Sequence, residues 1–242
     1  MPDPALALRR DALARRVFSL SGVVPLGVFL VVHVVVNARA LRGAEAFTGA
    51  ADAFARIPGL ALVEAVFVFA PLLFHAAFGL YLVAARRPLV TPSPYPRALG
   101  IAVRATGVAA LAFLAMHLPE LRFHLPGARP AGGELLTLLA ADLSSTSRGV
   151  PWRGVLYLLG SACVTFHFAA GVWGFFAGTR RGEEARARRF AGWAAGALGA
   201  TMWLLFADVV VFHATGARTF GAAPDAPGLA EPCPPPPSSA AP

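Results

Sequence analysis

The sequence predicts an all-helical membrane protein with five transmembrane helices. Its 242 residues are 57% hydrophobic and only 14% charged, and the mean hydropathy is +0.62. A soluble domain needs more polar surface than this composition supplies. The hydrocarbon core of a bilayer is about 30 Å thick, so a helix that spans it needs roughly 20 apolar residues. Five runs of about this length occur along the chain.

The five apolar runs cover residues 17–38, 60–85, 99–118, 155–177 and 190–213. The first run is too long for a cleaved signal peptide, so we expect it to be retained as a span. Pro25 and Pro71 lie inside the first two runs. Transmembrane helices tolerate proline, because neighbouring helices and local backbone adjustments satisfy the freed backbone groups. The runs therefore predict one transmembrane domain over residues 17–213.

The segments outside the runs are polar or compositionally biased. Residues 1–16 form an arginine-bearing arm. The connection 119–154 is long for a helical bundle, and we expect a short amphipathic segment near residues 134–143. Residues 214–242 are rich in Pro, Ala, Gly and Ser, so we expect a disordered tail.

The arginines predict the orientation in the membrane. Those in the N-terminal arm and in the links after the second and fourth runs are Arg9, Arg10, Arg15, Arg16, Arg86, Arg87, Arg97, Arg180, Arg181, Arg186, Arg188 and Arg189. Those on the opposite side are Arg39, Arg42, Arg56, Arg122, Arg129, Arg148, Arg153 and Arg218, and Arg104 lies within the third run. The first group is concentrated beside helix ends, so the positive-inside rule places the N-terminus in the cytoplasm and the C-terminus outside. This clustering explains the net charge of +8 without nucleic-acid binding.

Four of the six histidines lie in the first four apolar runs, one in each: His33, His75, His117 and His167. An ionisable residue at membrane depth is costly and normally faces the bundle interior with a partner. For a single such histidine, a hydrogen bond between helices explains the position as well as a functional role does. Four in successive runs indicate a shared role in the interior of the bundle.

The depths of these histidines sort them into two pairs. With a rise of about 1.5 Å per residue, His33 and His117 lie roughly 24 to 27 Å from the cytoplasmic starts of their helices. His75 and His167 each lie about 15 Å before the cytoplasmic ends of theirs. We name these the outer pair and the inner pair. Two histidines at one depth on facing helices can clamp a haem iron from both sides, which predicts that four of the helices form a haem-binding bundle.

A local repeat surrounds the inner pair. An aromatic residue precedes each histidine, a glycine follows it by four residues, and another aromatic comes two residues later. The glycines are Gly79 and Gly171. Positions four apart share a helix face, so we expect these glycines to leave room for a flat macrocycle. A small-residue face for helix packing explains the repeat equally well.

Glu64 is a candidate catalytic residue. It precedes His75 by eleven residues, which in a regular α-helix puts both on one face, roughly 16 Å apart. A carboxylate near the outer end can transfer protons at a quinone site. The alternative is an interfacial carboxylate paired with Arg56 or Arg153.

Four further polar residues lie at the ends of the runs. Arg39 and Arg122 follow the outer histidines by six and five residues, and either could meet a haem propionate or extend to the membrane surface. His124 is expected in an interfacial loop. His213 ends the fifth run without a partner at its depth, so we do not assign it as a ligand.

With these residues the chain resembles a known family. This family is the five-helix type of single-subunit dihaem cytochrome b anchor found in succinate dehydrogenases and quinol:fumarate reductases. The resemblance covers about residues 15–177 and extends to the fifth run only by hydropathy. It rests on the order and spacing of the four histidines and on their flanking sequences, at residues 16–27, 33–37, 42–47, 64–79, 117 and 166–173. Phe18 departs from the pattern, because relatives often have a histidine there.

The resemblance implies a subunit that carries electrons and reacts with quinone but is not an active enzyme alone. It implies two haems b, the outer one held by His33 and His117 and the inner one by His75 and His167, with iron as the bound metal. It also implies a flavoprotein (FAD) subunit and an iron–sulfur subunit on the cytoplasmic face, and a quinone, usually menaquinone. The expected location is the bacterial cytoplasmic membrane.

Two other function classes compete with this one. The dihaem anchors of nitrate reductases, formate dehydrogenases or hydrogenases usually carry two haem-ligating histidines on one helix, a pattern this chain lacks. A transporter or assembly factor could use the histidines for protons or a metal ion, and it would show no haem absorbance.

Overall fold

The computed structural model describes residues 4–85, 96–123, 132–179 and 185–217. In this part of the chain the regular secondary structure is helical, apart from a single bridge between Ser147 and Val150. Five helical segments are long and apolar enough to cross a membrane. The predicted fold class is therefore confirmed.

Three of the spans are single helices and two are interrupted. α6 (Arg97–Leu121), α8 (Trp152–Thr179) and α9 (Ala185–Thr215) are continuous. The first span consists of α1 (Pro4–Val23) and α2 (Pro25–Ala38), and the second of α4 (Leu60–Glu64), η2 (Ala65–Phe69) and α5 (Ala70–Ala84). Residues 4–16, expected as an arm, thus begin the first helix.

Prolines account for both interruptions. A proline lacks the N–H that would bond the carbonyl four residues earlier, and its ring clashes with that carbonyl. At Pro25 the helix still continues on both sides, since Val24 donates to the Leu20 carbonyl and Val28 to the Val24 carbonyl, both at 2.9 Å. Pro71 follows a π-helical stretch, Ala65–Phe69. The wider turns of this stretch accommodate the missing donor within a continuous span.

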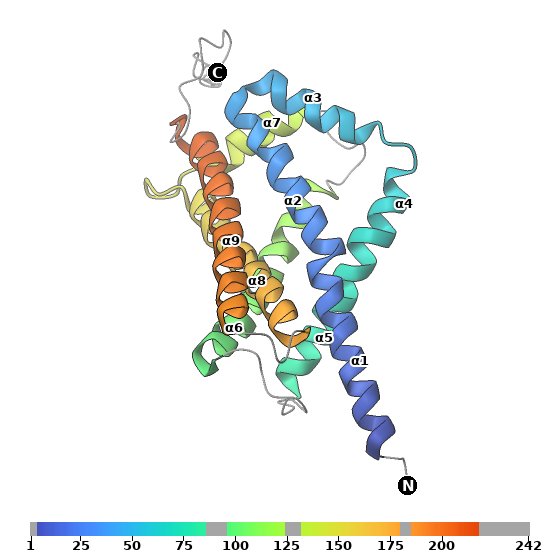
Figure 1. The fold of residues 1–242 in the computed structure, drawn as a ribbon. Helices are drawn as coiled ribbons and strands as arrows, with labels where there is room; N and C mark the ends of the chain where they lie inside the picture. Colours follow the sequence, from blue (N-terminus) through green and yellow to red (C-terminus); the bar gives the residue numbers. More distant parts are fainter. Residues whose placement is uncertain (1–3, 86–95, 124–131, 180–184, 218–242) are drawn as a thin grey trace, which may run out of the picture.

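Two shorter helices lie at one end of the bundle. After η1 (Arg39–Arg42), α3 (Ala44–Ala55) runs beside α7 (Gly132–Ser144), as Figure 1 shows. α7 coincides with the segment expected near 134–143, whereas α3 was not predicted. The buried apolar core lies here, where η1, α3, α7, α8 and α9 meet, and consists of Ala40, Phe47, Leu139, Leu143, Tyr157 and Val210.

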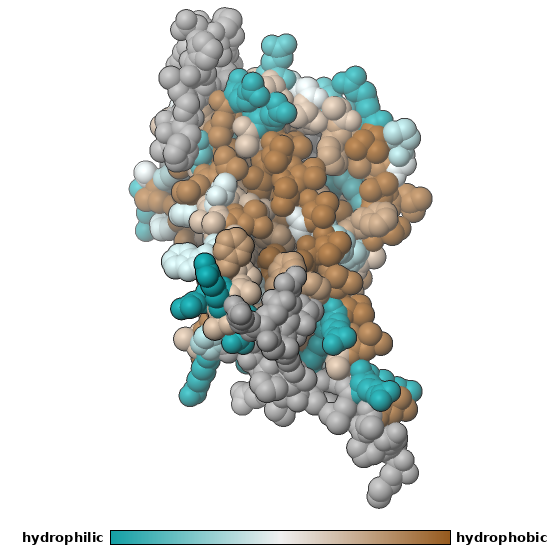
Figure 2. Space-filling model, viewed as in Figure 1, coloured by the Kyte–Doolittle hydropathy of each residue, from teal (hydrophilic) through white to brown (hydrophobic). Residues whose placement is uncertain are grey.

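The remaining contacts bring the histidine-bearing helices together. α8 packs against α6 and α9 and also contacts α1, while α5 packs on α1. Much of the middle of the molecule presents apolar side chains outward, and Figure 2 shows this hydrophobic surface between more polar ends. Such a surface is stable only in lipid, as expected for spanning helices.

Several expectations fall on residues that the structure does not describe. His124, Arg129 and the paired arginines at 86–87 and 180–181 are among them, as is the Pro-rich tail from residue 218 onward.

Candidate functional site

The four membrane-depth histidines lie in two pairs. The ring centres of His75 on α5 and His167 on α8 are 6.1 Å apart, with the rings at 82°. Those of His33 on α2 and His117 on α6 are 5.9 Å apart, at 86°. The structure thus brings together the residues of the inner pair and the residues of the outer pair.

The spacing within each pair fits one metal ion between two imidazoles. Ring nitrogens of histidine bind metal ions at about 2 Å, so two rings on opposite sides of one ion have their centres roughly 6 Å apart. Both observed separations agree with this value. Each pair is therefore suited to axial ligation of a haem iron.

The backbone of α1 orients the ring of His75. Its Nδ1 lies 3.1 Å from the Phe18 carbonyl oxygen and 3.3 Å from the Ser21 hydroxyl. The ring of Phe18 stacks on that of His75, with centres 4.3 Å apart and planes at 13°. When Nδ1–H donates to a carbonyl, Nε2 is left with its lone pair, which is the form that binds a metal.

His167 is held in the same way by a different helix. Its Nδ1 lies 2.9 Å from the Val103 carbonyl oxygen on α6. A glycine makes room for each inner ring: a Cβ added at Gly22 would lie 2.6 Å from Cε1 of His75, and one at Gly107 would lie 2.7 Å from Cε1 of His167. The inner pair is thus built symmetrically, with one carbonyl and one glycine for each histidine.

The outer pair has a more aromatic environment. His33 packs on Phe29 and Phe206, with ring centres 5.5 and 5.8 Å away. His117 packs on Phe113 and Tyr157, with ring centres 5.3 and 5.7 Å away. The Asn37 amide donates to the His33 carbonyl at 2.8 Å and lies 3.4 Å from Nδ1 of that ring.

Two buried polar atoms beside the outer pair have no hydrogen-bond partner among the described residues. They are Nδ1 of His117 and the hydroxyl oxygen of Tyr157, whose residue is only 6% exposed. An unsatisfied buried polar group costs stability, so such atoms commonly mark a place where another molecule binds. When the other ring nitrogen of His117 binds a metal, Nδ1 points away from it, so an ordered water is the simplest partner for such atoms.

The two glycines of the sequence repeat have different surroundings. A Cβ at Gly79 would make an ordinary contact with the Phe18 ring at 3.5 Å, whereas a Cβ at Gly171 would meet no described atom within 4 Å. Gly79 therefore packs beside the ring that stacks on His75, and Gly171 borders open space.

Glu64 forms an ion pair with Arg122, and its side chain is 12% exposed. Neither partner expected for it is found, because Arg56 donates to the Asp52 carbonyl and Arg153 bonds Glu120 and Asp142, at 2.6 and 3.0 Å. The expectation that Glu64 and His75 share one face of a regular α-helix is also wrong. The intervening stretch Ala65–Phe69 is π-helical, and its residues turn less per step than those of an α-helix.

His213 does not join either pair. It is buried on α9 with its ring 5.4 Å from that of Phe212, and its Nε2 has no hydrogen-bond partner within the described structure.

Several residues of the site were not identified from the sequence. Gly22, Gly107, Ser21 and Val103 contact histidines of other helices. The glycines could be seen in the apolar runs. What each glycine faces depends on the register between helices, and the sequence of one helix does not determine that register.

The comparisons with known proteins point to one family. The succinate dehydrogenase cytochrome b558 subunit of Bacillus subtilis (strain 168) is 35% identical to the chain over 167 residues, which are 69% of this chain and 79% of that protein. No protein-family model matches the chain, and no solved structure matches it.

Proposed function

The chain belongs to the family of succinate dehydrogenase cytochrome b subunits, and on that premise we propose that it holds two haems b. One lies between His33 and His117 and the other between His75 and His167. The observation that supports this most is the separation of about 6 Å between ring centres in both pairs.

The two pairs occupy different levels of the bundle. Gly22, which touches His75, precedes His33 by eleven residues, and Gly107, which touches His167, precedes His117 by ten. Both intervals correspond to about 15 Å of helix. Two independent helices therefore give the same spacing, which supports two separate sites stacked across the membrane.

The chain's own residues hold and orient the ligands. The carbonyls of Phe18 and Val103 fix which nitrogen of His75 and His167 faces the pair, and the aromatic rings around His33 and His117 exclude water. A haem with two histidine ligands supplies a one-electron carrier whose potential depends on hydrogen bonding to the ligands and on burial. The different surroundings of the two pairs predict two different potentials.

The proposal extends to the partners and the substrate. A flavoprotein (FAD) subunit and an iron–sulfur subunit dock on the cytoplasmic face beside the inner pair, and electrons pass between them and menaquinone. The dense arginine segments support this orientation, with the N-terminus in the cytoplasm and the C-terminus outside.

Glu64 serves proton transfer at the quinone site. It is a carboxylate at the outer end of the second span, largely shielded and paired with Arg122 from the third. A quinone that gains or loses electrons must also gain or lose protons, and a positioned carboxylate provides a route for them. The similarity to the cytochrome b558 subunit gives no comparable support to a dihaem anchor of another oxidoreductase or to a transporter.

The test is the haem content of the purified complex, with its reduced-minus-oxidised visible spectrum. We expect two haems b for each copy of this chain. A single haem for each chain, or none, would overturn the proposal.

A further inference from the structure

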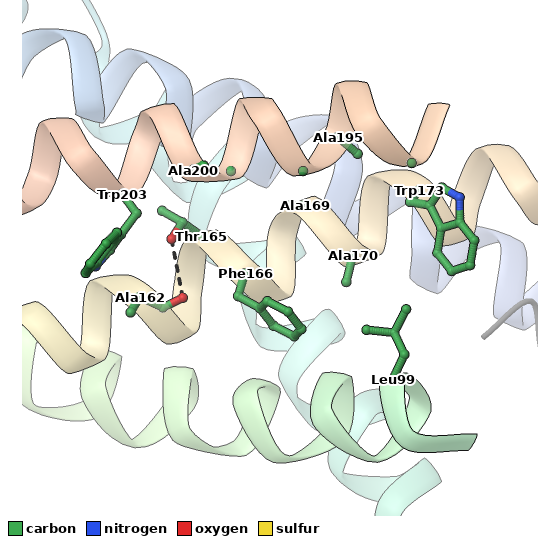
Figure 3. A pocket seen from close by; sticks show the side chains of 13 residues that line it. Leu99, Ala162, Thr165, Phe166, Ala169, Ala170, Trp173, Ala195, Ala200 and Trp203 are labelled. Atoms are coloured by element: carbon green, nitrogen blue, oxygen red, sulfur yellow. Dashed lines mark hydrogen bonds between the residues drawn. The ribbon is translucent and has the colours of Figure 1, made fainter. Parts of the chain in front are cut away.

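A groove of about 530 Å³ lies between α8 and α9, and none of the four paired histidines lines it. Figure 3 shows its walls: Phe166 and Trp173 on α8, Trp203 on α9, and Leu99 of α6 near Trp173. Its floor on α9 is made of small residues, among them Gly192 and Gly196. The groove is open on one side, where the rings of Phe166 and Trp203 are exposed.

The groove offers its occupant almost no hydrogen bonds. The indole N–H of Trp173 donates to the Arg188 carbonyl and that of Trp203 to the Leu158 carbonyl, both at 3.3 Å. The Thr165 hydroxyl donates to the Ser161 carbonyl at 2.8 Å. A quinone ring or a polar peptide would leave its own polar atoms unsatisfied here, so the surface suits a hydrocarbon chain.

The length of the groove matches one leaflet. From Gly192 to Trp203 the helix advances eleven residues, or about 16 Å. Half of a hydrocarbon core about 30 Å thick is nearly the same distance. The groove therefore runs from the membrane surface to near the midplane, which is the depth that a single acyl chain reaches.

Positive charge stands at the surface end of the groove. Arg188 and Arg189 precede Gly192 by four and three residues and are exposed, so they share its helix face. Arg97, also exposed, begins α6 two residues before Leu99. Guanidinium groups bind phosphate well, and basic sites beside transmembrane helices attract anionic lipid.

We propose that this groove is a specific site for one anionic phospholipid, with an acyl chain along Gly196 and the phosphate at Arg188 and Arg189. The proposal does not depend on the haem assignment. It requires only that the chain spans a membrane, with these arginines at its surface.

The test compares lipid binding to the full chain in its purified complex by native mass spectrometry. Phosphatidylglycerol and phosphatidylcholine with identical acyl chains are the probes. Gly196→Leu places bulk in the groove at a position where an added Cβ meets no described atom within 4 Å. Ala197→Leu adds the same bulk on the neighbouring exposed position, which does not line the groove. Arg188→Gln is matched by Arg186→Gln, which removes a charge from another face of α9.

We expect one phosphatidylglycerol to be retained by the unaltered chain and by the two control variants. Gly196→Leu abolishes this retention, and Arg188→Gln weakens it by about fivefold. Equal retention of both lipids, or equal loss in Gly196→Leu and Ala197→Leu, would mean bulk annular lipid only and would overturn the proposal. A protein dimer that dissociates in Gly196→Leu would assign the groove to a second copy of the chain instead.

Discussion

Each histidine of the inner pair faces a glycine on a neighbouring helix, and neither contact leaves room for a side chain. Gly22 lies against His75 and Gly107 against His167, where an added methyl group would come within 3 Å of the imidazole. Helix interiors disfavour glycine, so its presence at both positions is explained by the rings that need the space.

Gly107→Ala tests this requirement. The added carbon forces the His167 ring to move, and overpacking of this kind typically costs about 1–3 kcal/mol. We expect a shifted midpoint potential, or loss of one b-type component from the difference spectrum, with the other component unchanged. Gly49→Ala in α3 is the control, because a Cβ there meets no described atom within 4 Å. An unaltered spectrum and potential in Gly107→Ala would show that this contact does not position a ligand.

Gly171→Ala separates the two explanations of the sequence repeat. No described protein atom lies within 4 Å of a Cβ at this position, so helix packing predicts no effect beyond a small gain in helix propensity. If a flat cofactor lies beside Gly171, the added methyl group contacts it. We then expect the absorbance band of the inner haem to shift. The difference spectrum of the purified complex decides between them, and an unchanged spectrum would remove Gly171 from the cofactor site.

At the residue scale, the sequence was sufficient to group the histidines but not to identify their supports. Depth along a helix follows from counting residues, which is why His33 was matched with His117 and His75 with His167. The carbonyl of Val103 and the glycines opposite the rings depend on how helices are rotated against each other. That rotation is set by packing of the whole bundle.

At the scale of the elements, the π-helical stretch Ala65–Phe69 connects the Glu64–Arg122 ion pair to the helix that carries His75. Stretches of this kind often occur at functional sites. Here the stretch changes which face Glu64 presents and brings it to Arg122 at the end of α6. Periodicity of a regular helix could not predict this partner.

Glu64→Gln tests the role of this carboxylate. Without a titratable group, we expect quinone turnover to fall roughly a hundredfold, while both haems remain. Succinate oxidation with an artificial dye acceptor persists, because that electron path does not pass through this subunit. Glu120→Gln is a matched control, since it removes one acidic partner of Arg153 and leaves Asp142 in place. If the quinone rate of Glu64→Gln equals that of the control, Glu64 has only a structural role.

The five spans were predictable because twenty consecutive apolar residues have few other uses. Helix α3 was missed, although it carries the buried Phe47. It lies in a connection, and its apolar residues alternate with alanine, glycine and acidic residues without a long run. Short helices of this type gain their stability from packing against neighbours, here α7 and η1.

At the scale of the whole molecule, the two ends carry different kinds of charged residue. The end beside His33 and His117 has a buried core and the ion pairs of Arg153 with Glu120 and Asp142. The other end carries the exposed arginines that begin α9 and α6. The inner pair lies nearer this second end, so we expect the iron–sulfur partner to dock there.

Protease protection tests the docking face. In the assembled complex we expect the connection between α8 and α9 to be cut more slowly than in the isolated subunit. Cuts in the connections at the opposite end serve as the internal reference. Protection of those opposite connections alone would contradict both the docking face and the proposed orientation.

The central claim is that the four histidines form two axial pairs, each of which holds one haem. The most direct measurement is the haem content and difference spectrum of His75→Ala, His167→Ala and the double variant, with His213→Ala as the control. We predict that all three lose the same b-type component and keep the other, that the double variant loses no more than either single one, and that His213→Ala keeps both. Loss of different components in His75→Ala and His167→Ala would contradict the pairing.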